Sequence, residues 1–534
     1  MKRFHLYTLI AAAAVTGMVT TSCSDFLTEE PKGQLPSESY FKDKAALDGA
    51  LNALYSVVST SQASNNFIGT NFLAGDDIST HPSSNKQPLR EHDQYHVTNN
   101  NAWLASLWEQ RYKVIKAANF IINNAGSTPG ATPQEIEQTL AQAHFWRGYS
   151  YFYLVTTWGE VPVTLKEEID YNAPLKPIEE VYQLVIDDLT KAEQGCPAHY
   201  TQEPYARNGV NVAVGQAAVK AALSYVYMCM AGWPLNRGTE YYQKAADKAE
   251  EVIDGVENGT YRQRLLERYD EVHSWKYNYN NPETLLGIYY NRDQNGNSMP
   301  LTDMLQEMKQ SGWGDTNGEI KFWKDFPEGP RKEATYFPQV MLSDGKLYDW
   351  WYDTDPTSRE VVAPVFMKTA EGAKRGTEFD YTDPGRVNSQ GEKTIQVIRL
   401  SQVYCWYAEA TGRAGKSTEK AVKALNKVRN RADGKETNLY TSALSADQLA
   451  EAAYNEHGWE IAGYYWGGFA TRARDMFRMN RLKDHFEYRK ENPMIEVSPG
   501  IFRNEKVPVT GTWDDQKMYS PYPYEDATLN PNLK

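Results

Sequence analysis

One stretch, residues 141–163 (AQAHFWRGYSYFYLVTTWGEVPV), constrains the fold of this chain more than any other. Its apolar residues recur at helical spacing, at Ala141, Phe145, Tyr149 and Phe152. Gly148 lies among large aromatic residues in the middle of this helix, where it costs about 1 kcal/mol relative to alanine. We therefore expect a second helix to pack closely against Gly148. The helix is predicted to end at Trp158-Gly159, with Pro162 just beyond.

Helical periodicity continues through much of the chain, so the predicted fold class is all-α. The predicted helical runs are residues 44–60, 103–124, 178–194, 212–231, 241–254, 394–411, 417–432 and 445–481. Small residues on one face of residues 212–231 suit tight helix packing. Such pairs resemble tetratricopeptide units, although no clean period of about 34 residues is present. Residues 59–101 form a long polar stretch without periodicity, which favours a functional loop.

The character of the chain changes between residues 268 and 393, where Gly, Pro, Asp and aromatic residues dominate. We expect a long, loop-rich insertion here with short strands, for instance at residues 285–290. The predicted segments are therefore a signal peptide (1–22), a tether (23–40), an N-terminal helical part (41–267), the insertion (268–393) and a C-terminal helical part with a terminal motif (394–534).

The first 22 residues are typical of a secretory signal. Lys2 and Arg3 precede an apolar run that is too short for a spanning helix, and small residues stand directly before Cys23. This layout resembles a lipobox, with Thr20 in place of the more usual Leu. We predict that Cys23 is acylated and holds the protein on a membrane, since each buried methylene contributes about 0.8 kcal/mol. The alternative is an ordinary exported protein with an incidental cysteine.

The chain is acidic, with a formal net charge of −13 that becomes −15 once Lys2 and Arg3 leave with the signal. An acidic body repels phosphate backbones and anionic lipid surfaces. No basic run is interleaved with aromatic residues, so nucleic acid is not an expected partner. The cysteines have no metal-ligand spacing, and Cys229 and Cys405 are expected to be small buried residues.

No sequence motif for catalysis stands out, and no cofactor or metal is expected. Residues 410–417 (ATGRAGKS) satisfy a relaxed phosphate-loop pattern, but a helix precedes them where a phosphate loop needs a strand. A helix-turn-helix capped by Ser417 or Thr418 is the expected structure. His457 and Glu460 share a helix but lack a second histidine for a metal, so packing is expected. Paired carboxylates for glycoside hydrolysis stay open, because sequence does not show separation in space.

Three segments resemble the SusD/RagB family of Bacteroidota outer-membrane nutrient-binding lipoproteins. They are the helix that ends in WGEVPV, the CSDFL start of the mature chain, and the C-terminal PYPYEDATLNPNLK. The resemblance implies a tetratricopeptide-like helical scaffold with a loop-rich insertion, and a lipid anchor at Cys23 on the cell surface. It also implies capture of a glycan, without breaking a bond, and delivery to a SusC-like, TonB-dependent outer-membrane transporter.

In that family the ligand lies on an exposed aromatic arc surrounded by Asn, Asp and Arg. By region, the resemblance places ligand residues in the N-terminal loop at Asp76, Asp77, Arg90, Asn101 and Trp103, and in the insertion at Trp275, Tyr277, Trp313 and Trp351. Trp275 and Tyr277 alternate, so in an extended segment both rings point to one side, where a sugar ring can stack. The alternative is that these rings cover a hydrophobic core.

Other functions stay open at this level. A surface glycoside hydrolase requires two carboxylates that face one cleft. A peptide-binding member of the same family, or a helical-repeat adaptor, requires no glycan at all.

Overall fold

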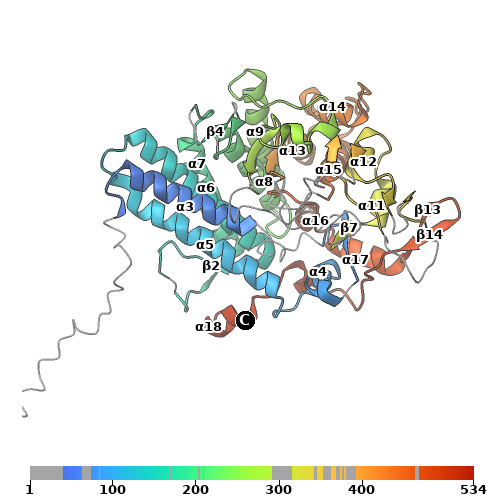
Figure 1. Cartoon of the computed structure of the whole chain (residues 1–534), viewed down its shortest axis with the longest axis horizontal. Helices are drawn as coiled ribbons and strands as arrows, with labels where there is room; N and C mark the ends of the chain where they lie inside the picture. The colour runs from blue at the N-terminus through green and yellow to red at the C-terminus, as the bar shows by residue number, and fades with distance from the viewer. Residues whose placement is uncertain are drawn as a thin grey trace, which may run out of the picture.

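The computed structural model describes residues 40–62, 74–82, 84–168, 170–201, 205–207, 210–290, 315–341, 346–352, 363–368, 373–375, 378–379, 393–463 and 468–533. Helices dominate these ranges, and the strands in them are short and form two-stranded pairs (Figure 1). The predicted all-α class is confirmed.

The main helices pack mostly on their neighbours along the chain. They are α3 (Lys44–Gln62), α5 (Ala102–Asn124), α6 (Pro133–Trp158), α7 (Ile178–Gly195), α8 (Gln216–Ala231), α9 (Gly238–Glu257), α13 (Leu400–Arg413), α14 (Glu419–Asp433) and α15 (Ala446–Ile461). Each helix in the series α3, α5, α6, α7, α8, α9 packs on the next one. Helix α9 then packs on α13, which also contacts α14 and α15. This succession of local contacts is that of a helical solenoid, as the tetratricopeptide-like prediction requires.

Helix α6 contains the stretch that constrains the fold. It begins at Pro133, earlier than predicted, because Thr132 and Glu135 form a capping box in which each side chain accepts the other residue's backbone N–H. From Ala141 to Trp158 every side chain is buried, so the predicted stripe is one part of a helix that is covered all round. The helix ends as predicted at Gly159, whose φ of +77° suits glycine.

The predicted close neighbour of Gly148 is helix α7. A Cβ atom on Gly148 would lie 3.2 Å from Cβ of Asp188 and 3.4 Å from the carbonyl oxygen of Val185. Asp188 is itself fixed by hydrogen bonds from Arg147 Nε at 2.8 Å and Nη2 at 2.7 Å. The absence of a side chain at Gly148 therefore lets α6 and α7 approach each other closely.

Three predicted helical runs were wrong in part. Residues 395–399 form strand β12 (Ile395–Arg399) instead, because they pair with β6 (Thr284–Ile288) of the insertion. The run 445–481 is broken after α15 at Gly463, which has a φ of +67°, and resumes as α16 (Arg472–Arg478). Helix α8 begins at Gln216, later than predicted, with Gly215 as its N-cap.

The insertion contains the short strands that were predicted, and it also contains short helices. These elements are α11 (Ile320–Asp325), α12 (Pro330–Thr335), β8 (Val340–Met341), β9 (Leu347–Tyr348), β10 (Ala373–Arg375) and β11 (Glu378–Phe379). Strand β7 (Thr316–Gly318) pairs with β1 (Ile78–Thr80) of the N-terminal loop, which joins the two segments predicted to hold a ligand. The loop also contains helix α4 (Gln87–Asp93), so it is more regular than its sequence indicated.

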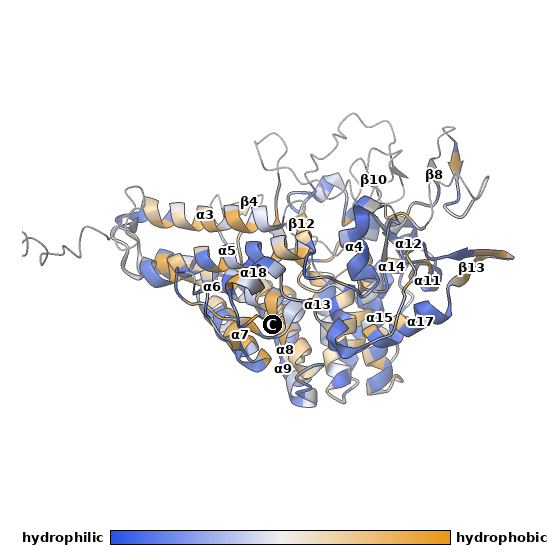
Figure 2. Cartoon of the chain, turned by 90° about the horizontal axis from the view of Figure 1, so that it is seen from below, coloured by the Kyte–Doolittle hydropathy of each residue, from blue (hydrophilic) through white to orange (hydrophobic). Residues whose placement is uncertain are grey.

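The remaining elements are short. They are β2 (Val161–Pro162) with β3 (Leu175–Lys176), β4 (Ala206–Arg207) with β5 (Val210–Asn211), α17 (Leu482–Glu491), the hairpin β13 (Met494–Ser498) and β14 (Ile501–Asn504), and α18 (Tyr524–Leu529). Figure 2 shows β8 and β13 projecting at the end of the molecule opposite α3. The turn between α13 and α14 is the predicted helix-turn-helix, with Thr418 as the N-cap of α14. Cys196, Cys229 and Cys405 are buried and free.

Candidate functional site

Asp76 and Asp77 of the N-terminal loop are engaged inside the protein. Asp76 forms a bidentate ion pair with Arg472, at 2.6 and 2.9 Å. Burial opposes ionisation of Asp76, but the guanidinium outweighs it and holds the pKa of Asp76 below its usual value. Asp77 is 3% exposed and accepts the backbone N–H of Gly463 at 2.8 Å. Both carboxyl groups fasten the loop to the C-terminal part, and their role in ligand binding stays a prediction.

The other predicted residues of this loop differ in their access to solvent. Asn101 is 3% exposed and is the N-cap of α5, where its side chain accepts the N–H groups of Trp103 and Leu104, both at 3.2 Å. Trp103 is half-buried at the start of α5 and packs against the core. Arg90 is also half-buried, and its Nη1 donates to the carbonyl oxygen of His81 at 3.3 Å. Arg90 and Trp103 thus retain exposed surface that a ligand can reach.

Trp275 and Tyr277 lie in a 3-10 turn (Trp275–Tyr277) rather than in the extended segment on which their predicted alignment depended. Both rings are half-buried, and each carries a lysine over its face: Lys393 Nζ lies 4.8 Å from the Trp275 ring centre, and Lys276 Nζ lies 4.6 Å from that of Tyr277. Trp313 lies outside the described residues.

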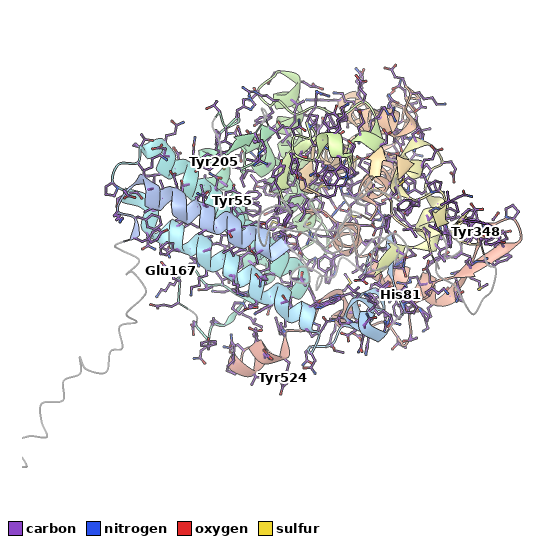
Figure 3. All side chains as sticks on the ribbon, in the orientation of Figure 1. Tyr55, His81, Glu167, Tyr205, Tyr348 and Tyr524 are labelled. Atoms are coloured by element: carbon purple, nitrogen blue, oxygen red, sulfur yellow. The ribbon has the colours of Figure 1, made fainter. Side chains whose placement is uncertain are left out.

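Partly exposed aromatic residues gather around the paired strands β8 and β9 of the insertion. Tyr348 and Tyr352 stack with ring centres 4.5 Å apart and planes 15° from parallel, and Tyr352 is 47% exposed. Trp351 is half-buried beside them and packs on Trp323, with ring centres 5.4 Å apart. Figure 3 shows Tyr348 at the end of the molecule remote from Tyr55 and Glu167. We call Trp323, Tyr348, Trp351 and Tyr352 the aromatic platform.

Sequence reasoning identified only Trp351 of this platform. Tyr348 and Tyr352 stand four positions apart in the same LYDWWYD segment, and this spacing is the sequence feature that could have indicated them as site residues. The fold supplies the rest, because Arg503 of β14 donates to the carbonyl oxygen of Trp351 and so fixes the segment against the C-terminal hairpin.

A cavity of about 520 Å³ opens between the N-terminal loop and a C-terminal segment that sequence reasoning did not include in the site. This volume lies within the range of small-molecule sites. The lining residues from the loop are Ala74, His92, Tyr95, His96 and Val97, and those from the C-terminal part are Leu482, Asp514, Gln516, Lys517, Met518, Tyr519, Ser520, Pro521 and Tyr522.

Tyr95, in the wall of this cavity, has a left-handed backbone conformation. Tyr95 has a φ of +55°, which is uncommon for a residue with a side chain. The hydroxyl of Tyr95 donates to the carbonyl oxygen of Ala74, and Lys517 Nζ donates to the carbonyl oxygen of Tyr95, both at 2.8 Å. Burial lowers the pKa of His92 to about 4, so this imidazole is neutral near pH 7. The lining is therefore rich in aromatic side chains, and it carries the charged groups of Asp514 and Lys517.

Three fully buried carboxylates are engaged by arginines and do not form a hydrolytic pair. Glu283, Glu456 and Glu460 are fully buried, and each pairs with an arginine: Glu283 with Arg431 at 2.5 Å, Glu456 with Arg331 at 2.8 Å, and Glu460 with Arg399 at 2.9 Å. A glycosidase needs two carboxylates that face one cleft. Among the described residues that line the cavity, Asp514 is the only carboxylate.

The described residues contain no group of three or more His, Cys, Asp or Glu side chains placed to hold a metal ion. His457 has the predicted packing role: its Nε2 accepts the indole N–H of Trp406 at 3.1 Å, and its Nδ1 lies 2.6 Å from Asp475. Within the same ranges, none of the helices combines the length and the hydropathy that crossing a bilayer requires.

Comparison with known sequences finds two family models that together cover most of the chain. The model described as "Starch-binding associating with outer membrane" matches residues 25–228, and the model of the SusD family matches residues 275–534. A SusD-like protein of Bacteroides ovatus is 23% identical, over 99% of this chain and 98% of its own length. SusD-like protein P2 of Formosa agariphila is 24% identical, over 95% and 99%.

Solved structures share the fold. A SusD homolog from Bacteroides thetaiotaomicron superimposes with a TM-score of 0.74 at 19% identity, covering 93% of this chain and 97% of that one. A structure with xylogluco-oligosaccharide gives a TM-score of 0.70 at 21% identity, and a laminarin binding SusD-like protein gives 0.68 at 19% identity, each covering 92% and 98%. Taken with the family models and the full-length relatives, the helical array and its insertion show that this chain belongs to the SusD/RagB family.

Proposed function

We propose that this protein is a cell-surface glycan-binding lipoprotein. It captures an oligo- or polysaccharide and passes it to a SusC-like, TonB-dependent outer-membrane transporter, and it breaks no bond in doing so. Acylation of Cys23, which lies outside the described residues, anchors the protein so that its body faces the extracellular side of the outer membrane. The related structures with xylogluco-oligosaccharide and with laminarin-binding activity support a glycan as the ligand.

The observation that carries the proposal is the aromatic platform. Tyr348 lies at the end of the molecule remote from Tyr55 and Glu167 and stacks on Tyr352; Tyr348 is half-buried, and Tyr352 is 47% exposed. Exposed flat rings are a surface on which the apolar C–H face of a sugar can lie, and their hydroxyl groups can bind sugar hydroxyls. Within this proposal Arg90, Trp103, Trp275 and Tyr277 remain additional ligand residues.

Binding on such a platform is shallow, so we expect dissociation constants nearer micromolar than nanomolar, which corresponds to about −8 kcal/mol or weaker. The test is calorimetry with the lipid-free protein that lacks residues 1–23, titrated with laminari-oligosaccharides and xylogluco-oligosaccharides, after a glycan array has widened the search. Saturable binding with no release of reducing sugar is the expected result. Release of reducing ends would instead make the protein a surface glycoside hydrolase, and binding of peptides alone would make it a peptide-binding member of the family.

The anchor is tested separately by mass spectrometry of the mature protein. We expect the chain to begin at Cys23 and to carry acyl groups on its thiol and amine. An unmodified cysteine at this position would contradict the anchor and leave the binding proposal standing.

A further inference from the structure

Buried carboxyl groups gather where the N-terminal loop meets the insertion and the C-terminal helices. Asp77 stands immediately before β1 and Glu319 immediately after β7, and these two strands pair from Ile78 with Gly318 to Thr80 with Thr316. Asp76, Asp93 at the end of α4, and Glu505 after β14 complete the group. We call Asp76, Asp77, Asp93, Glu319 and Glu505 the acid junction. Four of them are at most 9% exposed, and Asp76 is partly covered.

Two of the five acids have a dedicated arginine. Asp76 pairs with Arg472, and Oδ1 of Asp93 pairs with Arg489 Nη1 at 2.7 Å. Oδ2 of Asp93 also accepts the backbone N–H and hydroxyl of Thr80, at 2.9 and 2.7 Å, which ties the end of α4 to β1. The two guanidinium groups that face the junction are therefore ion-paired with Asp76 and Asp93, although the charge of Arg489 also lowers the pKa values of Glu319 and Glu505 against the larger effect of burial.

The other three acids have no Lys or Arg ion pair in the described part of the chain. Asp77 accepts the N–H of Gly463, and Oε1 of Glu505 accepts the N–H of Ile320 at 2.6 Å, whereas Oε2 of Glu505 has no hydrogen-bond partner there. Oε2 of Glu319 lies 2.9 Å from Nε2 of His485. Burying three unpaired negative charges is costly, and protonation is the usual response.

The electrostatics of the surrounding groups agree with this geometry. Burial, with the neighbouring Asp76, raises the pKa of Asp77 to about 7, and burial, with Glu319, raises that of Glu505 to about 8. Burial holds the pKa of Glu319 well above its usual range. Among the other titratable neighbours, burial lowers the pKa of His485 to about 4 and raises those of Tyr95, Tyr336 and Tyr488, so these four groups stay uncharged, and burial also lowers the pKa of Lys368.

We propose that the acid junction is a proton-held clasp: Asp77, Glu319 and Glu505 hold the N-terminal loop and the insertion against the C-terminal part while they are neutral, and they loosen this contact when they ionise. The native state binds more protons than the opened state, so the clasp is fully closed below the ordinary carboxyl pKa and weakens as the pH rises through 7 to 8. Because Ala74, His92 and Tyr95 of the same loop line the cavity, the pH sets how firmly that wall is held.

The test is hydrogen exchange of the whole protein, measured by mass spectrometry at pH 6 and pH 8.5 and expressed as protection factors, which remove the intrinsic pH dependence of exchange. We expect protection of β1 and α4 to fall by at least about tenfold between the two values, while protection of α6 does not change. This readout requires no ligand, so it stands or falls independently of the glycan proposal.

The decisive variant is the double substitution Asp77→Asn and Glu505→Gln. Each amide keeps the shape and the acceptor oxygen of the neutral acid, so we expect β1 and α4 to remain as protected at pH 8.5 as at pH 6. Glu525→Gln, an exposed glutamate at the start of α18, is the matched control and should behave like the wild type. Two results would overturn the proposal. One is that protection of the wild-type loop does not change with pH, and the other is that the double variant loses protection as the wild type does.

Discussion

Three arginines converge on Glu460, at the point where the insertion joins the helical array. Oε1 of Glu460 lies 2.5 Å from Nη2 of Arg431 on α14 and 2.9 Å from Nη1 of Arg399 at the end of β12. Arg331 of α12 approaches its other oxygen at 3.5 Å. Burial opposes ionisation of this carboxyl group, but the three guanidinium groups together lower its pKa to about 2.

This shift sets the expected cost of Glu460→Gln. A pKa that falls from its ordinary value to about 2 corresponds to about 3 kcal/mol of stability at neutral pH. The glutamine keeps the volume but removes the charge, and it leaves buried guanidinium groups under-compensated, for which a loss of about 3–5 kcal/mol is usual. We therefore expect Glu460→Gln to lower the free energy of unfolding by about 3 kcal/mol at pH 7.

The pH dependence of this difference checks its cause. The native pKa of Glu460 is depressed, so its contribution is present above the unfolded pKa and is lost as the pH falls from about 4.5 towards 2. The free energies of unfolding of the wild type and of Glu460→Gln, measured with urea, should therefore converge as the pH falls below 4. Glu491→Gln, an exposed glutamate at the end of α17, is the control and should cost nothing measurable. A loss below about 1 kcal/mol at pH 7, or a loss that does not change with pH, would refute the reasoning.

Two further predictions follow from the packing of the helices. Gly148→Val should lower the free energy of unfolding in urea by about 1–3 kcal/mol, because the valine side chain would crowd Asp188, which already lies 3.2 Å from the position of a Cβ atom. Gly126→Val should not lower the free energy of unfolding in this way, because no atom lies within 4 Å of the position of its Cβ atom. Cys196 and Cys229 should resist alkylation by iodoacetamide at pH 8 until the protein is unfolded. Both are buried, and burial raises the pKa of each thiol to about 12. Alkylation of the native protein at either position would contradict the packing.

Local sequence predicted the helices well because their signals are local. The aromatic helix, its stop at Gly159 and the need for a close neighbour at Gly148 all follow from spacing and side-chain size. Residues 395–399 could not be assigned in the same way, because they become a strand through pairing with residues 284–288, more than a hundred positions earlier. A short apolar run fits a helix or a strand equally well until its partner is known.

The candidate site was less predictable, for the same reason. The role of Asp76 depends on Arg472 and that of Asp77 on Gly463, partners that lie nearly four hundred residues away. The alignment of Trp275 and Tyr277 depended on an extended backbone, and the chain turns there instead. Tyr348 and Tyr352 gain their importance from stacking, which their spacing alone did not reveal.

The central claim is that a glycan binds on the exposed rings of the insertion. Calorimetry with the best glycan from the array should be run on the wild type, on Tyr352→Ala and on Tyr524→Ala, which removes a similarly exposed ring from α18 at a distant part of the surface (Figure 3). We predict that Tyr352→Ala weakens binding by about tenfold or more, a loss of about 1.4 kcal/mol, and that Tyr524→Ala leaves affinity unchanged. Equal affinities for all three proteins would contradict the account.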